Sequence, residues 1–470
     1  MDITLLSTEI LIAVLGLMAL VLGLALPQKG KGLVGGFTVV GLVIILINAI
    51  YSFGIEAQLF NGVYAIDTFG SFFKVLFIIA AILVILSAKD YTDNFANRRA
   101  EFYSFMIFAL LGMVIMACAN ELITLYIGLE LMAVSFYILT AYLLSDELSA
   151  EAGLKYLILG AISSAILLFG MSLVYAISGT TVISEIAANL VLEPVLVAGV
   201  VLLIAGFAFK ISLIPFHMWA PDIYQGAPTP VTAFLAVASK AAAFAALLRV
   251  FVIGLPMASF DWNFILAILA AITMIAGNLM ALRQSNVKRL LAYSSIAQAG
   301  YILVGLIAFN VYGLKGVLFY SMLYVFSNIG AFAVATSVEV VEGSTDIKAF
   351  SSLGKRSPFM AAIMTVCLLS LAGIPPLAGF VGKFYLFAGV IEAGYLWLAF
   401  IGLIMSMISV YYYLNVAKAM YIGDRADISP ITPSFSAKIA LWTCLAGTIL
   451  IGVYPAPLTN FVQTAVSIFM

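Results

Sequence analysis

Five ionisable side chains lie within or beside apolar sequence, where they could bind and release protons. They are Glu130, Lys155, Lys210, Lys240 and Lys383. An ionisable group deep in a membrane costs roughly 2.5–3.5 kcal/mol on insertion scales, so it persists where it faces a polar interior. A buried lysine suits proton transfer, because burial disfavours its charged form and a nearby carboxylate favours it again. We therefore expect a proton pathway; the alternative is that each charge only holds helices together.

Glu130 and Lys155 lie on apolar segments that a short polar loop, residues 145–150, connects. Because a short connection places two helices side by side, we expect these residues to form a pair that couples movement to proton transfer. Glu151 lies about one helical turn before Lys155 and is a competing partner for the lysine.

Two of the apolar segments contain helix-breaking residues. The segment 210–228 contains three prolines and begins with Lys210, and the segment 371–383 contains two consecutive prolines and ends with Lys383. Prolines remove backbone donors, and membranes tolerate such breaks where the freed groups line a cavity. Both breaks are therefore predicted ion sites. His217, in the first break, titrates near neutrality and is a possible proton entry; the alternative is an interfacial anchor.

The composition indicates a membrane protein that crosses the bilayer many times. Of 470 residues, 64% are apolar and 9% are charged, against about 45–50% and about 25% in soluble domains. A net charge of -1 leaves no basic surplus for binding nucleic acid. The three cysteines lie far apart, and no glycine-rich phosphate-binding motif occurs. The sequence therefore predicts no metal and no cofactor bound to this chain.

The apolar stretches predict an all-α polytopic fold with about 14 transmembrane helices, since each crossing needs about 20 apolar residues. The fourth to eighth and the ninth to thirteenth spans form two units of five, each with its broken helix in fourth place. Five is odd, so the units are inverted relative to each other. The predicted domains are 1–100, 101–255, 256–420 and 421–470. The predicted spans are 8–27, 33–53, 69–88, 101–118, 121–144, 152–177, 195–215, 229–254, 262–282, 289–309, 312–340, 357–391, 394–420 and 437–456.

Fourteen of the 21 Lys and Arg residues lie at connections that follow odd-numbered spans. By the positive-inside rule these connections are cytoplasmic, so both termini are expected outside the cell. The fourteen are Lys29, Lys31, Lys89, Arg98, Arg99, Arg283, Lys288, Arg289, Lys348, Lys355, Arg356, Lys418, Arg425 and Lys438.

Several of these motifs together resemble the antiporter-like membrane subunits of respiratory complex I and the related subunits of multi-component sodium/proton antiporters. They are Glu130 in Gly-Leu-Glu-Leu, the segments 210–228 and 291–301, Ser239-Lys240, and the segment 373–383. The resemblance extends over nearly the whole chain from about residue 100. Within that family, Gly-Phe-Val-Gly-Lys383-Phe-Tyr is similar to subunit N, since subunit M carries a glutamate at the matching place.

The resemblance implies proton pumping driven from a distance. Glu130 and Lys155 would form the coupling pair, Lys210 the central lysine, Lys240 the relay and Lys383 the terminal group. NADH, FMN, iron–sulfur clusters and quinone would be bound by partner subunits, and the location would be the bacterial plasma membrane.

One position departs from the family. Many relatives carry a histidine where this chain has Gln298, so Gln298 is expected to order water molecules rather than to accept the proton. A sodium/proton antiporter subunit remains the alternative function.

Overall fold

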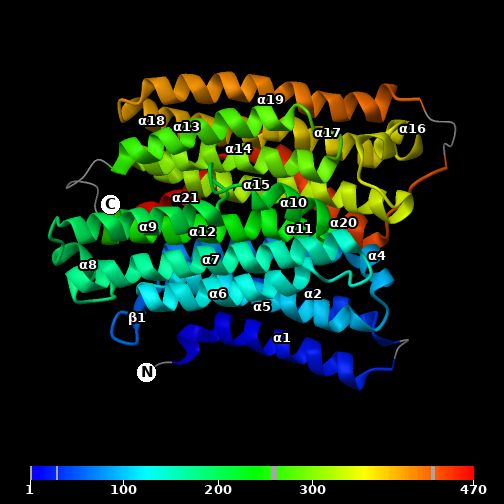
Figure 1. Ribbon diagram of the computed structural model, residues 1–470. Coiled ribbons are helices and arrows are strands. Elements are labelled where there is room, and N and C mark those ends of the chain that lie inside the picture. The colour runs from blue at the N-terminus through cyan, green and yellow to red at the C-terminus, as the bar shows by residue number, and fades with distance from the viewer. Residues whose placement is uncertain (1–2, 28–29, 256–261, 425–428, 470) are drawn as a thin grey trace.

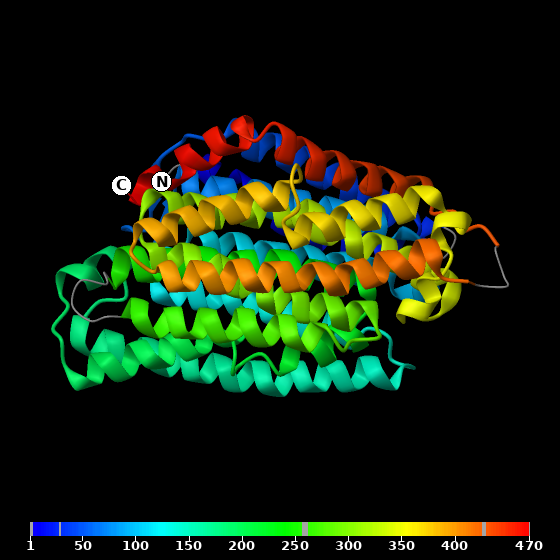
Figure 2. The ribbon, with the colours of Figure 1, turned by 90° about the horizontal axis from the view of Figure 1, so that it is seen from above.

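The structure is a computed structural model that describes residues 3–27, 30–255, 262–424 and 429–469. Long helices run side by side in one bundle (Figures 1 and 2). Strands are confined, among the described residues, to one antiparallel hairpin in which Ala57 pairs with Ile66. The predicted all-helical membrane architecture is therefore confirmed.

The first part of the chain consists of three long helices and the hairpin. The side chain of Asp67 accepts a hydrogen bond from the Gly70 backbone N–H (2.7 Å) and thereby starts the third helix. The elements are η1 (Ile3–Leu6), α1 (Ser7–Ala25), α2 (Leu33–Tyr51), β1 (Ala57–Leu59), β2 (Tyr64–Ile66), α3 (Thr68–Ser87), α4 (Lys89–Thr92) and η3 (Asp93–Arg98).

The next group contains the first broken helix, in which α9 ends at Lys210 and the short α10 follows after eight residues. Two π-helical turns, η4 and η5, flank α12. The elements are α5 (Arg99–Cys118), α6 (Leu122–Thr140), α7 (Glu147–Ser178), α8 (Ile183–Ala188), α9 (Pro194–Lys210), α10 (Trp219–Gly226), α11 (Thr229–Phe234), η4 (Leu235–Ser239), α12 (Lys240–Leu248) and η5 (Arg249–Gly254).

The last group contains the second broken helix, α17 with α18. It ends with α20 and a short helix, α21, that the sequence did not predict. The elements are α13 (Trp262–Ala281), α14 (Val287–Ala308), α15 (Val311–Glu342), η7 (Ile347–Phe350), α16 (Leu353–Arg356), α17 (Pro358–Ala372), α18 (Ala378–Glu392), α19 (Leu396–Ile422), α20 (Phe435–Val453), α21 (Ala456–Val466) and η8 (Ser467–Phe469).

Twelve helices of the described chain are long and apolar enough to cross a membrane, counting Thr229–Gly254 as one. Two shorter apolar helices, α9 and α17, precede the two breaks. The predicted span 357–391 is therefore two helices, because Gly373 at φ +86° ends α17 in a left-handed conformation. The predicted span 195–215 is likewise too long, since its helix ends at Lys210.

The N- and C-terminal ends lie at the same end of the bundle, next to β1 and α8 (Figure 1). The short helices α4 and α16 lie at the opposite end, and they carry Lys89, Lys355 and Arg356. These three residues belong to the set predicted to be cytoplasmic. Two others of that set, Lys29 and Arg425, lie outside the described residues.

The central helices are buried and the outer ones face the surroundings. In the most apolar stretch of α15, 94% of residues are buried, against 28% in α2 and in α20. Small residues allow close packing, since a Cβ on Gly112 of α5 would lie 2.5 Å from the Met132 backbone nitrogen of α6. The buried ionisable side chains therefore lie on rigid, closely packed helices.

Candidate functional site

The predicted direct pair of Glu130 and Lys155 is wrong. Lys155 Nζ lies 2.6 Å from a carboxylate oxygen of Glu151 and 3.0 Å from one of Asp222. Oε1 of Glu130 is buried without a hydrogen-bond partner, and the carboxylate instead interacts electrostatically with Lys210. The physical reason is the break after α9, because it lets α10 pack against α7 and present Asp222 to the lysine.

Asp222 belongs to a small polar cavity that the sequence analysis did not identify. Its two carboxylate oxygens accept hydrogen bonds from Lys155 (3.0 Å) and from Arg289 Nη1 (2.7 Å). The cavity measures about 180 Å³, and Glu151 and Gln225 also line it. The side chain of Lys155 is 40% exposed, so it is much less buried than Lys210, Lys240 and Lys383. The signal available in the sequence was an acid within the proline-rich break.

Lys210 is the last residue of α9 and is 5% exposed. Ser164 Oγ, on α7, accepts a long hydrogen bond from its Nζ (3.4 Å), and the ring of Phe209 lies 5.9 Å from Nζ. The nearby carboxylate of Glu130 supplies the opposite charge. Lys210 therefore has few close acceptors, and the charge of Glu130, on α6, favours its protonated form.

Lys240 lies where the π-helical turn η4 changes into α12. Such single-turn irregularities often occur at functional sites. Nζ donates to the Ser295 carbonyl (3.1 Å) and hydroxyl (2.8 Å) of α14, and it lies 5.8 Å from the ring centre of Tyr224. A cavity of about 10 Å³ lies beside Lys240, Ser295 and Gln298, close to the room that one water molecule needs.

Gln298 connects the surroundings of Lys240 with those of Lys383. Its Oε1 accepts from Tyr320 (2.5 Å), and its Nε2 donates to the Leu371 carbonyl (3.1 Å) and, at 3.4 Å, to Tyr413. The Leu371 carbonyl also accepts from Lys383 Nζ (3.0 Å). The two side chains therefore share one acceptor at the end of α17.

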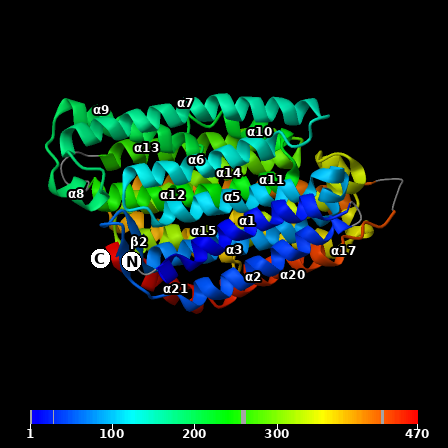
Figure 3. The same cartoon turned by 90° about the horizontal axis from the view of Figure 1, so that it is seen from below.

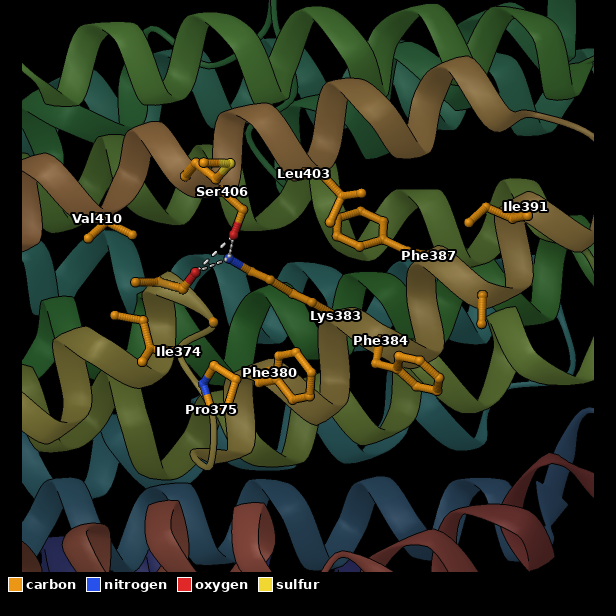
Figure 4. A pocket seen from close by; sticks show the side chains of 14 residues that line it. Ile374, Pro375, Phe380, Lys383, Phe384, Phe387, Ile391, Leu403, Ser406 and Val410 are labelled. Carbon is orange, nitrogen blue, oxygen red and sulfur yellow. Dashed lines mark hydrogen bonds between the residues drawn. The ribbon is translucent and has the colours of Figure 1, made fainter.

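Lys383 is 4% exposed and projects from α18 toward the end of α17 (Figure 4). Its Nζ donates to the Leu371 and Ala372 carbonyls (3.0 and 3.1 Å) and to Ser406 Oγ of α19 (2.8 Å). The last carbonyls of a helix lack partners within the helix and carry partial negative charge. Lys383 therefore caps the C-terminal end of α17.

A cavity of about 530 Å³ lies beside Lys383 and Ser406 and is otherwise lined mainly by apolar side chains (Figure 4). Phe384 and Met407, which border it, are 61% and 75% exposed. The cavity thus leads from Lys383 to the lateral surface of the molecule.

His217 lies between α9 and α10 and is buried, with Nδ1 lacking a hydrogen-bond partner. Within the described residues, His217 forms no hydrogen bond or ion pair with Lys210, Lys240 or Lys383. No group of three or more His, Cys, Asp or Glu side chains suited to a metal ion occurs within the described ranges. The three cysteines are buried and unpaired.

Comparison with known proteins places these features in a family. Residues 119–409 match the family model described as "NADH:quinone oxidoreductase/Mrp antiporter, TM". The chain is 51% identical over 468 residues to NADH-quinone oxidoreductase subunit N of Heliobacterium modesticaldum, covering 99% of both chains. It is also 51% identical to the subunit N of Desulfitobacterium hafniense, covering 99% of this chain and 98% of that one.

Among solved structures, the chain resembles one from respiratory complex I of Thermus thermophilus with bound aureothin. The TM-score is 0.84 at 33% sequence identity, and the match covers 97% of this chain and 99% of that chain. The likeness therefore extends over the whole bundle, including both broken helices.

Proposed function

The chain belongs to the antiporter-like membrane subunits of NADH-quinone oxidoreductase, the family that includes subunit N, and we propose that it carries protons across the membrane when partner subunits transfer electrons. The observation that carries this proposal is the row of three buried lysines with Glu130 in one bundle. Lys210, Lys240 and Lys383 are each at most 5% exposed, and buried charges inside membranes usually mark ion pathways.

In the proposed pathway, Glu130 and Lys210 form the coupling pair, and protons pass through Lys240 to Lys383. The hydrogen bonds from Lys240 to Ser295 and from Gln298 to Leu371 support this order, because both acceptors lie between the two lysines. Lys155 then has a different role: with Asp222 and Arg289 it lines a polar mouth on the side of the basic residues. His217 stays a proposed entry group.

The surroundings of Lys383 suggest how a proton is held and released. An ammonium group has three N–H donors, and three oxygen acceptors surround Nζ. Loss of the proton removes one donor, so one of these three oxygens loses its hydrogen bond from Nζ. Proton occupancy of Lys383 is therefore linked to the packing of the second break.

The proposal includes fourteen spans in two inverted units. Counting each broken helix as one span adds α9 and α17 to the twelve longer ones. In both units the third helix has 32 residues and the fourth is broken, and the fifth has 26 residues in one unit and 27 in the other. Since each unit has five spans, the second unit begins on the side of the membrane opposite the first.

Isolated backbone pairings support the same division. Glu121, which caps α6, pairs with Val182 after α7, and Asn286, which caps α14, pairs with Asp346 after α15. In each unit, then, the start of the second helix is fixed to the segment that follows the third. The proposed domains remain 1–100, 101–255, 256–420 and 421–470.

Each proton moved against 100 mV requires about 2.3 kcal/mol. We assign the source of this energy to partner subunits that hold FMN, iron–sulfur clusters and quinone and oxidise NADH. The location in this proposal is the bacterial plasma membrane, with both termini outside.

A sodium/proton antiporter subunit is the second candidate, because the matching family model includes the Mrp antiporters. It would use the same buried lysines but would respond to ion gradients instead of electron transfer.

Purification of the tagged chain from its native membrane distinguishes the two. Flavin and iron–sulfur subunits that copurify and reduce quinone with NADH are expected, and Lys210→Ala should lower the protons moved per electron pair. Small antiporter subunits without redox proteins, and proton flux that depends on sodium, would support the second candidate instead.

A further inference from the structure

A groove separate from the lysine pathway lies between α2, α3, α5 and the start of α20. Its volume is about 400 Å³. Gly32, Gly35 and Gly36 of the α2 end line one side, and Ile85, Lys89 and Tyr103 line the other. Figure 3 shows α2 at the edge of the bundle, next to α20. The groove thus faces the surroundings of the molecule.

The glycines keep this groove open. A Cβ on Gly36 would have no heavy atom within 4 Å, so any side chain there would extend into free space. Farther along the same face, Val40, Ile44 and Ile47 are each more than half exposed. The groove therefore continues into an apolar surface suited to the hydrocarbon layer of a membrane.

Cationic groups lie at the mouth of the groove. Lys89 is exposed and, among the residues that the structure describes, makes no ion pair. Arg99 Nη1 lies 3.6 Å from the position of a Cβ on Gly32, and its Nε is buried without a partner. The acids nearby are occupied: Asp93 pairs with Arg99 (2.9 Å), and Asp90 accepts from the Ser434 N–H (2.9 Å).

We propose that this groove binds an anionic phospholipid, with one acyl chain along Gly32, Gly36 and Val40 and the phosphate beside Lys89. Basic groups between helices at the interface attract acidic head groups, and the groove supplies apolar surface directly below them. The unpaired lysine favours an anionic lipid over a zwitterionic one. This site is independent of the proton pathway.

The test uses the complete complex, purified from its membrane and depleted of lipid. It is incubated with phosphatidylglycerol or phosphatidylcholine that carries a photoreactive acyl chain, and cross-linked peptides are identified by mass spectrometry. We expect cross-links to residues 32–40 and 85–89 that are about fivefold more frequent with phosphatidylglycerol, since one lysine near a membrane surface contributes about that factor.

Two variants separate the acyl-chain and head-group contacts. Gly36→Leu fills the groove and should abolish these cross-links with both lipids, whereas Ile44→Phe changes an apolar residue of α2 that does not line the groove and should not. Lys89→Gln should remove the preference for phosphatidylglycerol, whereas Lys355→Gln, an exposed lysine at the same end of the bundle, should keep it. Equal labelling by both lipids in the unchanged complex, or cross-links from the groove to another protein subunit, would overturn the proposal.

Discussion

The three deeply buried lysines differ in how well their charge is held. Lys383 has three oxygen acceptors and Lys240 has two, whereas Lys210 has one long hydrogen bond and the field of Glu130. Hydrogen bonds to charged groups contribute about 1.5–3 kcal/mol each. Lys383 therefore has the most hydrogen-bond acceptors for its ammonium group, and Lys210 depends most on the charge of Glu130.

Ser406→Ala tests this view of Lys383. The variant removes one of three acceptors of the ammonium group, so Lys383 should hold its proton about tenfold or more less tightly, as expected for a loss of about 1.5–3 kcal/mol, and the proton yield per electron pair should fall. The measurement is proton translocation per electron pair in membrane vesicles, over a range of pH.

The control is Ser409→Ala, because the Ser409 hydroxyl donates only to the Ser406 carbonyl of its own helix. Equal proton yields and equal pH profiles in the two variants would show that Ser406 does not act through Lys383.

Gln298 is predicted to order the connection between Lys240 and Lys383. Gln298→Leu should reduce proton translocation several-fold, since it leaves the Tyr320 hydroxyl and the Leu371 carbonyl with one partner fewer each. Gln298→His should retain more activity, because an imidazole can donate and accept in the same place. Proton yield per electron pair checks both. A leucine variant with unchanged yield would mean that no proton passes this position.

The sequence predicted which residue types would be buried but not every contact between them. Lys210, Lys240 and Lys383 could be identified because a lysine in an apolar segment is rare. Of the partners of Lys155, Glu151 was expected and is confirmed. Asp222 could not be predicted, since it reaches the lysine only through the course of the chain after α9. Ser406 gave no signal at all, because a single serine is common in apolar helices.

At the scale of helices, both breaks place a lysine beside a helix end. Lys210 is the last residue of α9, and Lys383 reaches back to the end of α17. The prolines and glycines predicted these interruptions. Their extent was not predictable, because the number of residues outside the helices depends on packing: α10 contacts both α7 and α14.

The N-terminal helices are joined by a buried ion pair that the sequence analysis did not foresee. Glu9 of α1 and Lys74 of α3 lie 2.6 Å apart, and Tyr64 donates to the same carboxylate (2.7 Å). Arg249 of η5 also binds Asp67, with both carboxylate oxygens at 2.8 Å. These contacts connect α1 with α3, and the start of α3 with the first five-helix unit.

Glu9→Gln should destabilise this region by about 3–5 kcal/mol, since it leaves the Lys74 ammonium buried without an opposite charge. The measurement is the temperature at which the subunit dissociates from the purified complex. The double variant Glu9→Gln with Lys74→Met should recover most of the loss, because it removes both charges. If the single variant is as stable as the unchanged protein, the pair contributes nothing.

At the scale of the whole molecule, the even number of proposed spans agrees with the position of both termini at one end of the bundle (Figure 1). The positive-inside rule then assigns the opposite end, with α4 and α16, to the cytoplasm. This prediction rests on the lengths of the apolar stretches and on the positions of the basic residues. The close packing of α5 against α6 could not be predicted from the sequence, because it depends on which helix faces the glycines occupy.

Cysteine labelling tests the orientation directly. The three native cysteines are buried and provide an unreactive background. A reagent that cannot cross membranes should label Glu56→Cys, near β1, in intact cells, and Lys355→Cys, in α16, only in inverted vesicles. The reverse pattern would place both termini in the cytoplasm.

The central claim is that Lys383 carries translocated protons, and the most direct test is the number of protons moved per electron pair in Lys383→Met. Methionine fills similar volume without a charge, so the complex should assemble and oxidise NADH while its proton yield falls. Lys315→Met is the control, since Lys315 lies at the start of α15, beside Tyr312, and has no assigned role. An unchanged proton yield in Lys383→Met would contradict this claim. The lysine would then have a structural role only, because packed apolar residues can replace structural charges.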